Sequence, residues 1–176
     1  MLHFRSQGFT LIELITVLAI VGILTMIAVP GMRSLVNNNR YVTDTNEFVA
    51  AVNLARNEAS KRGAPVGVAA KTVGGSTNFK NGWVVFVDTN TRNRVYDSAE
   101  NTSILTIQSH EPLRGHTTLG GDGTMPNVIM FDSRGLLSHD SALKYKLCDS
   151  DFTGTGNGVD GRQITIGLSA HVSVIR

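Results

Sequence analysis

The chain opens with a short polar stretch and then becomes almost wholly apolar. Residues 1–8 are polar and weakly basic, whereas residues 9–29 are almost wholly apolar and carry a single charged residue, Glu13. A helix of this length would extend about 32 Å, close to the thickness of the hydrocarbon core of a bilayer. The pattern therefore predicts a membrane-spanning helix over residues 9–30.

Two simpler kinds of apolar segment fit this stretch less well. A cleavable secretory signal has an apolar core of about 7–15 residues that ends in small residues at the cleavage site. Here the apolar run is longer, and Pro30 follows it. A plain signal-anchor helix would explain the length but not the carboxylate of Glu13, because a charge at membrane depth is costly and usually functional.

A second helical pattern continues from the first. Along residues 33–62 apolar side chains recur at spacings of three and four, as on one face of a helix; they include Phe48, Val52, Ala55 and Ala59. Lys61 and Arg62 supply the cations of a last turn, and Gly63 supplies a cap. We therefore predict one long helix, kinked at Pro30, with an amphipathic continuation over residues 31–63.

Residues 64–176 alternate short apolar runs with turn sequences, which predicts a β-rich domain. The strongest run, residues 82–88, is too apolar to leave one face in water. The predicted strands are residues 66–70, 82–88, 94–96, 103–107, 127–131, 143–148, 163–166 and 171–175, the last two forming a hairpin through residues 167–170. A turn is predicted at residues 132–135, and glycine-rich loops at residues 120–123 and 154–161.

Composition supports this division and excludes some functions. Hydrophobic residues make up 41% of the chain, enough for a core, and 18 glycines fit a domain with many turns. Charged residues make up only 17%, against about 25% in a typical soluble domain. The net charge of +2 gives no bulk electrostatic reason to expect a nucleic-acid partner.

The chain offers no pattern for metal, cofactor or catalytic chemistry. Cys148 is the only cysteine, so it forms no intramolecular disulfide and is expected to be a small buried residue. Asp149, Asp151 and Asp160 lack the spacing of a calcium loop. None of the five histidines lies in a recognised catalytic spacing, so we expect no enzyme and no cofactor.

The segment Gly8-Phe9-Thr10-Leu11-Ile12-Glu13-Leu14 resembles the class III signal of type IV pilins and type II secretion pseudopilins. The resemblance implies that prepilin peptidase cleaves after Gly8 and that the new terminus, Phe9, is N-methylated. Glu13 and Pro30 match the family's assembly glutamate and its kink. In a filament, Glu13 of one subunit would meet the Phe9 amine of a neighbour, because a pair shielded from water gains Coulomb energy.

Later segments resemble the FimT, FimU and GspH group of minor pilins and pseudopilins. They are Ala55-Arg56-Asn57-Glu58-Ala59 on the helix, and residues 82–88, 131–135 and 161–164 in the β-rich part. The resemblance implies an α+β pilin fold, in which a long, kinked N-terminal helix packs on a C-terminal antiparallel β-sheet domain.

The same resemblance implies a minor type IV pilin with a structural role in tip formation or initiation, assembled with other minor and major pilins. A GspH-like pseudopilin of type II secretion is one alternative, and a DNA-binding competence pilin of the FimT kind is another. In the last case Arg162, His171 and Arg176 would contact DNA, but His171 and Ser173 replace the arginines of that group's motif. Nucleic acid is therefore the less favoured partner.

The resemblance also implies a location. The chain is expected to cross the bacterial inner membrane once, in contact with its lipid, with the C-terminal domain in the periplasm. It would then enter a pilus or a pseudopilus.

Overall fold

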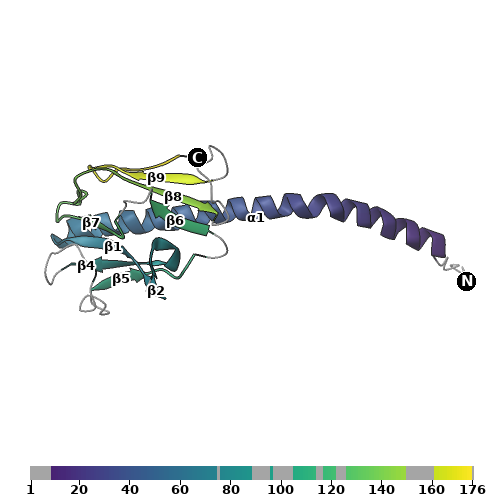
Figure 1. Ribbon diagram of the computed structural model, residues 1–176, viewed down its shortest axis with the longest axis horizontal. Coiled ribbons are helices and arrows are strands. Elements are labelled where there is room, and N and C mark those ends of the chain that lie inside the picture. Colours follow the sequence, from purple (N-terminus) through teal and green to yellow (C-terminus); the bar gives the residue numbers. More distant parts are fainter. Residues whose placement is uncertain are drawn as a thin grey trace, which may run out of the picture. The chain divides into compact units, whose positions relative to one another are not determined.

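The computed structural model describes residues 9–74, 76–88, 96, 105–113, 117–121, 126–149 and 161–175. The chain divides into two compact units, Met1–Asn39 and Arg40–Arg176. Helix α1 (Leu11–Arg62) begins in the first unit and ends in the second. Figure 1 follows the chain from α1 to the strands.

Helix α1 begins and ends close to the predicted positions. Its last residue is Arg62, and Gly63 follows with a φ of 61°, in the left-handed region that glycine adopts without steric cost. The helix continues through Pro30, whose side chain lies outside the described part. The kink predicted at Pro30 stays a prediction.

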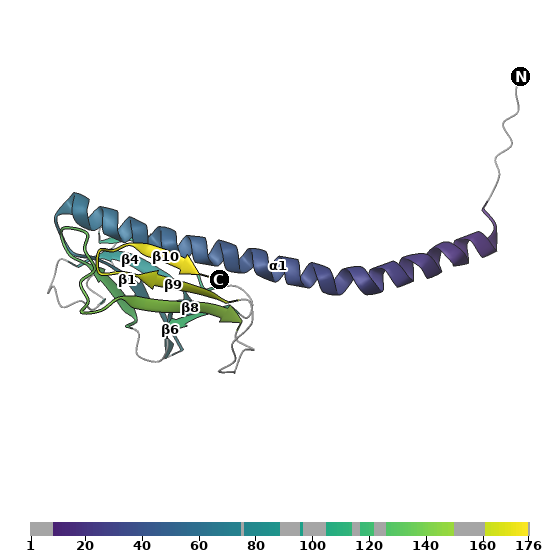
Figure 2. The same ribbon diagram turned by 90° about the horizontal axis from the view of Figure 1, so that it is seen from above.

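The second unit packs the C-terminal part of α1 against two antiparallel four-stranded sheets (Figures 1 and 2). The first sheet has the order β5-β4-β1-β7, made of β1 (Val66–Ala70), β4 (Trp83–Val87), β5 (Thr106–Ser109) and β7 (Val128–Phe131). The second has the order β10-β9-β8-β6, made of β6 (Thr117–Gly121), β8 (Leu143–Asp149), β9 (Arg162–Ile166) and β10 (Val172–Ile175). A short hairpin of β2 (Thr72–Val73) and β3 (Ser76–Thr77) leads into the 3-10 helix η1 (Phe79–Asn81).

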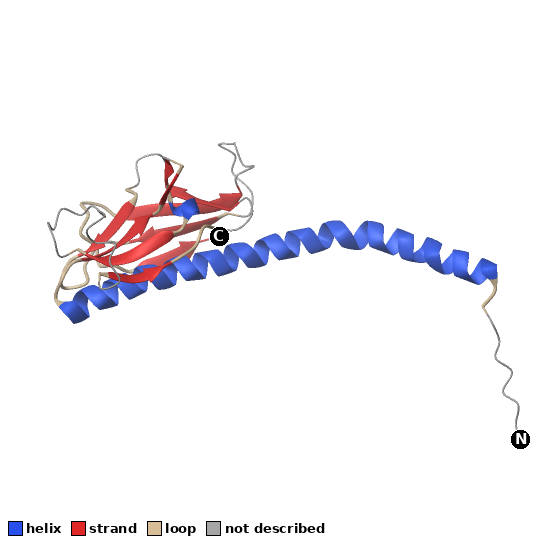
Figure 3. Cartoon of the chain, turned by 90° about the horizontal axis from the view of Figure 1, so that it is seen from below, coloured by secondary structure: helices blue, strands red, loops and turns tan. Residues whose placement is uncertain are grey.

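The α+β class and the packing of a helix on antiparallel sheets are therefore confirmed, as Figure 3 shows by its colours. The core forms along the predicted apolar face of α1, where Phe48, Val52, Ala55 and Ala59 are all buried. The Phe48 ring meets the rings of Phe79, Trp83 and Tyr145 edge to face, with centroids 5.2, 5.4 and 5.7 Å away. Edge-to-face rings stabilise a core beyond the area that they bury.

Strand β4 is buried on both faces, as its sequence predicted. Trp83, Val85 and Val87 belong to the main core, while Val84 and Phe86 belong to a second cluster on the other face of the sheet. Strand β1 is also buried on both faces: Val66, Val68 and Ala70 belong to the main core and Ala69 belongs to the second cluster.

The sequence-based prediction was wrong at β6. The sequence predicts a loop at Gly120 and Gly121, but these residues end β6 and pair with Lys146 and Tyr145 of β8. Strand β5 also runs from Thr106 to Ser109, later than the predicted residues 103–107. The predicted strand at residues 94–96 and the loop at residues 154–161 lie mostly outside the described residues.

Candidate functional site

The first turn of α1 carries Glu13, one of the two residues that the family resemblance assigns to assembly. Thr10 precedes the helix, and its Oγ1 accepts a hydrogen bond from the backbone nitrogen of Glu13, 3.3 Å away. The nitrogen of Leu14 donates to the Thr10 carbonyl at 3.2 Å. Thr-x-x-Glu is the spacing of a capping box, which satisfies free N–H groups at a helix start. Glu13 therefore lies in the first turn, where the helix dipole favours a negative charge.

The large apolar side chains of residues 9–26 are exposed, with Phe9 at 84% and Met26 at 83%. The other exposed large apolar side chains of this stretch are Leu11, Ile12, Leu14, Ile15, Val17, Leu18, Ile20, Val21, Ile23 and Leu24. A soluble monomer rarely exposes a continuous apolar surface larger than a few hundred Å². We therefore expect this apolar surface to be covered by lipid or by a protein partner.

Within the described part of the chain, no helix is both long enough and apolar enough to cross a membrane. The predicted span over residues 9–30 includes residues 27–30, whose side chains are not described. Gly8 also lies outside the described residues. Cleavage after Gly8, methylation of Phe9 and the span itself stay predictions.

The segment of α1 from Ala55 to Ala59, which resembles a stretch of the minor pilins, holds the end of the helix against a turn of the second sheet. Arg56 donates from Nη1 to the carbonyl oxygen of Ala170 at 3.2 Å, which ties α1 to the turn between β9 and β10. On the exposed side, Glu58 accepts hydrogen bonds from Arg62 and Lys61. The motif therefore serves the folded domain through Arg56.

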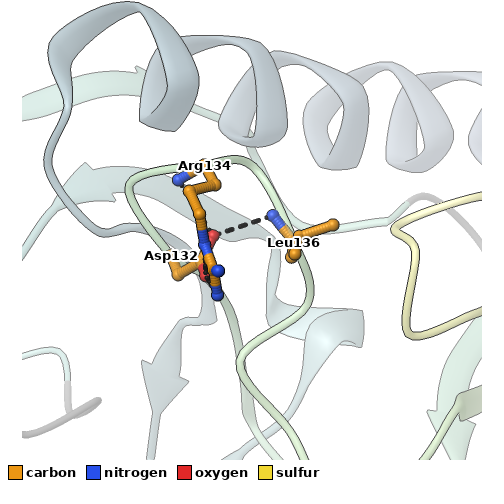
Figure 4. A network of polar contacts seen from close by, with 3 residues as sticks. All are labelled: Asp132, Arg134 and Leu136. Carbon is orange, nitrogen blue, oxygen red and sulfur yellow. Dashed lines mark hydrogen bonds and ion pairs between the residues drawn. The ribbon is translucent and has the colours of Figure 1, made fainter.

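The turn predicted at residues 132–135 is confirmed by a hydrogen bond from the Gly135 nitrogen to the Asp132 carbonyl, 2.8 Å long. Asp132 also accepts from the backbone nitrogens of Arg134 and Leu136, both at 2.9 Å, and from the Arg134 guanidinium at 2.8 Å (Figure 4). Burial alone would raise the pKa of Asp132, but the hydrogen bonds from Leu136 and Arg134 outweigh it and lower the pKa.

Of the three residues considered for DNA contact, Arg162 and His171 are described, and they lie at opposite ends of the β9–β10 hairpin. Arg162 begins β9, whereas His171 precedes β10 and accepts a bond from Gly167 beyond the far end of β9. About five residues separate the two positions along the hairpin, or roughly 16 Å at the rise of a β-strand. Arg176 lies outside the described residues.

Cys148 is partly buried on β8, where we expected a buried residue. Burial raises the pKa of its thiol, and the nearby Lys146 offsets part of the effect. Among the described residues, no group of three or more His, Cys, Asp or Glu side chains could hold a metal ion.

Comparison with known proteins gives two family matches. Residues 44–170 match the model of type II transport protein GspH, and residues 3–29 match the prokaryotic N-terminal methylation motif. The pilin-like protein PilA1 of Thermus thermophilus is 34% identical over 134 residues, which cover 74% of this chain and 78% of that protein.

Two solved structures share the fold. One is the type IV minor pilin FimU of Pseudomonas aeruginosa, with a TM-score of 0.60 and 16% identity over 81% of this chain and 92% of that one. The other is EpsH, the minor pseudopilin of the type 2 secretion system of Vibrio cholerae, with a TM-score of 0.51 and 11% identity over 77% and 96% of the two chains.

Proposed function

Because the chain belongs to the family of type II transport protein GspH, whose members are minor pilins and pseudopilins, we propose that it is a minor subunit of a type IV pilus. Its role is structural: it joins other pilins at the tip of the fibre or at the start of its assembly. We propose no catalytic activity for it.

The observation that carries this proposal is the exposed apolar surface of residues 9–26, on which Glu13 is the only charged residue. Cleavage after Gly8 would leave a free amine on Phe9, one helical turn from Glu13. In an isolated subunit both charges would lie beside hydrocarbon. In a filament, the Phe9 amine of one subunit and Glu13 of the next would form a shielded pair that sets their register. The match of residues 3–29 to the methylation motif supports this processing by prepilin peptidase.

Before assembly, inner-membrane lipid would cover the same apolar surface, with the unit Arg40–Arg176 in the periplasm. Burial of this surface would then pass from lipid to neighbouring pilins. Both environments are apolar, so the transfer would leave the Glu13 pair as the main determinant of position.

A pseudopilin of type II secretion is the second candidate. It is favoured by the GspH family model and by the shared fold of the EpsH pseudopilin. The processed N-terminus would serve both assemblies in the same way. Recovery of the chain from surface filaments or only from membranes would separate the two.

Substitution of Glu13 tests the assembly role. We expect Glu13→Ala to be inserted and cleaved normally but to enter filaments at least about tenfold less, because loss of a shielded charge partner costs about 2–5 kcal/mol. Thr25→Ala is the matched control, since the Thr25 hydroxyl donates to carbonyls of its own helix, those of Val21 and Gly22. Normal incorporation of cleaved Glu13→Ala would overturn the proposed role of the pair.

A further inference from the structure

Strand β10 is the last strand at its end of the second sheet (Figure 2), and its outer edge is open. The Gly167 nitrogen donates to the His171 carbonyl at 2.9 Å, which makes these residues a hydrogen-bonded pair of the hairpin. Such pairs alternate with pairs that are not hydrogen-bonded, and Val172 lies opposite Ile166 in the next pair. The N–H and C=O groups of Val172 and of Val174 therefore point away from β9. Among the described residues, none hydrogen-bonds to these outward groups.

The other sheet edges are covered or polar. At β7, Phe131 forms an antiparallel bridge with Leu137. The Ser138 nitrogen also donates to the Met130 carbonyl at 2.8 Å, so the segment after β7 covers its edge. Strand β6 lies beside η1, and β5 exposes the polar side chain of Gln108. Proteins usually protect an open edge with charges, proline or a covering segment, but the four residues of β10 include no charge and no proline.

Exposed apolar side chains lie around the same hairpin. Among the described residues of the second unit, five large apolar side chains are exposed: Val73, Leu136, Leu168, Val174 and Ile175. Leu168, Val174 and Ile175 belong to the β9–β10 hairpin, with exposed fractions of 53%, 40% and 58%. Leu136 is adjacent to it, because the nitrogen of Leu137 donates to the Leu168 carbonyl at 3.2 Å. Four of the five therefore border the hairpin whose edge is open.

The side chains of β10 alternate between the two faces of the sheet. Val172 packs against the main core, and Val174 lies on the same face, opposite the buried Ile164. Ser173 and Ile175 lie on the other face. A strand added to the edge, with apolar side chains at alternate positions, would cover the exposed part of Val174 and extend the core face of the sheet.

The charge of the hairpin indicates what kind of strand would fit. Residues 161–176 contain Arg162, His171 and Arg176 but no Asp or Glu. Two copies of the hairpin placed edge to edge would bring like charges together, which destabilises strand pairing. A strand that carries carboxylates would be attracted instead. Charge complementarity therefore favours a different, acidic chain over a second copy of this one.

We propose that β10 is a docking edge, to which an extended, net-acidic segment of another subunit of the same fibre adds as a fifth strand. Val172 and Val174 supply two N–H donors and two C=O acceptors, and Val174 and Ile175 supply the apolar contact. The identity of the partner as a fibre subunit rests on the proposed function.

Site-specific photo-cross-linking of the full-length protein, in cells that assemble the fibre, tests the proposal. With p-benzoylphenylalanine in place of Ile175, we expect ultraviolet light to join the chain to another pilin. Mass spectrometry of the cross-linked peptide should identify an extended segment that contains Asp or Glu. The same probe in place of Gln108, an exposed side chain on the edge strand β5, is the control and should not give this adduct.

Val174→Pro separates strand addition from simple apolar contact. Proline removes the outward N–H of Val174 but none of the hydrogen bonds to β9, which Ser173 and Ile175 make. With the probe at Ile175, the adduct should fall about tenfold or more, because a carbonyl of the partner loses its donor. Val174→Ala trims the same side chain but keeps the N–H, so its adduct should fall less. Should Val174→Pro not accumulate, Val174→Lys replaces it, since an edge lysine opposes strand addition.

The proposed function is judged separately, by the processed N-terminus at Phe9. A correctly processed subunit that gives no adduct from Ile175 would overturn strand addition and leave the proposed function standing. An adduct with a second copy of this chain, or with a protein that is not a pilin, would also overturn the proposal. So would an adduct with another pilin that Val174→Pro or Val174→Lys leaves unchanged.

Discussion

Arg56 and Ala170 are 114 residues apart in the sequence but joined by a hydrogen bond of 3.2 Å, from the Arg56 guanidinium to the Ala170 carbonyl. Ala170 is fully buried and has a φ of 60°, uncommon for a residue other than glycine. The bond therefore fixes a strained turn between β9 and β10 against α1. Arg56 lies on α1 between Ala55 and Ala59, which are both buried in the core.

Arg56→Ala should destabilise the second unit by about 1.5–3 kcal/mol, the range for a hydrogen bond from a charged donor. The measurement is chemical denaturation of the full-length protein in micelles, monitored by Trp83 emission at constant pH. Asn57→Ala is the control, because Asn57 is the exposed neighbour on the same helix turn. Equal stability of the two variants would show that the Arg56 bond does not hold the turn.

Gly135→Ala should destabilise the protein by more than Gly74→Ala does. Both glycines have a positive φ, 76° and 58°, so either substitution incurs a backbone cost of about 1–3 kcal/mol. Only at Gly135 would the added β-carbon also overlap the Ser60 Oγ, whereas the site at Gly74 is open. Ser60→Ala should restore part of this loss when it is combined with Gly135→Ala. Thermal unfolding of the wild type, the two single variants and the double variant would measure the coupling between the two positions.

Phe48→Ala should be the most damaging single change in the core, with a cost of about 3–5 kcal/mol. The ring is fully buried and contacts three other aromatic rings. Phe48→Leu keeps most of the volume and should cost less, so urea midpoints of the two variants would separate ring contacts from cavity formation. A loss below about 1 kcal/mol for Phe48→Ala would contradict the packing described.

Asp132 should contribute to stability at neutral pH but not in acid. Its pKa is lowered in the folded chain, so the carboxylate form is favoured there and the unfolded chain binds the proton more readily. The contribution is therefore complete above the ordinary pKa of about 3.9 and is lost as the pH falls through the folded value. Asp132→Asn should lower the melting temperature at pH 7 and flatten its decline in acid. Asp140→Asn, a change of an exposed aspartate, is the control.

The sequence predicts the elements whose signals are local. The 3.6-residue periodicity around Phe48 defines the buried face of α1, and the apolar run of β4 predicts a strand without an exposed face. Strand β6 was missed because Gly120 and Gly121 have no strand preference of their own, and pairing with β8 determines their conformation.

The residues of the candidate site were likewise predictable only where their sequence signal is local. The segment from Gly8 to Glu13 is recognisable because its residues are contiguous. Arg56 and Ala170 are 114 positions apart, and nothing in either local sequence indicates that the fold brings them within 3.2 Å. Contacts of this kind are fixed by the pairing of strands and the packing of α1, so they are visible only in the structure.

The most direct test of the assembly role is mass spectrometry of the N-terminus, in protein from sheared surface filaments and from membranes. A minor pilin should yield a peptide that begins at N-methylated Phe9 in the filament fraction. The same processed peptide confined to membranes would favour the pseudopilin. An intact leader of residues 1–8 in both fractions, with a working prepilin peptidase in the cell, would contradict the account and leave the apolar segment as an anchor alone.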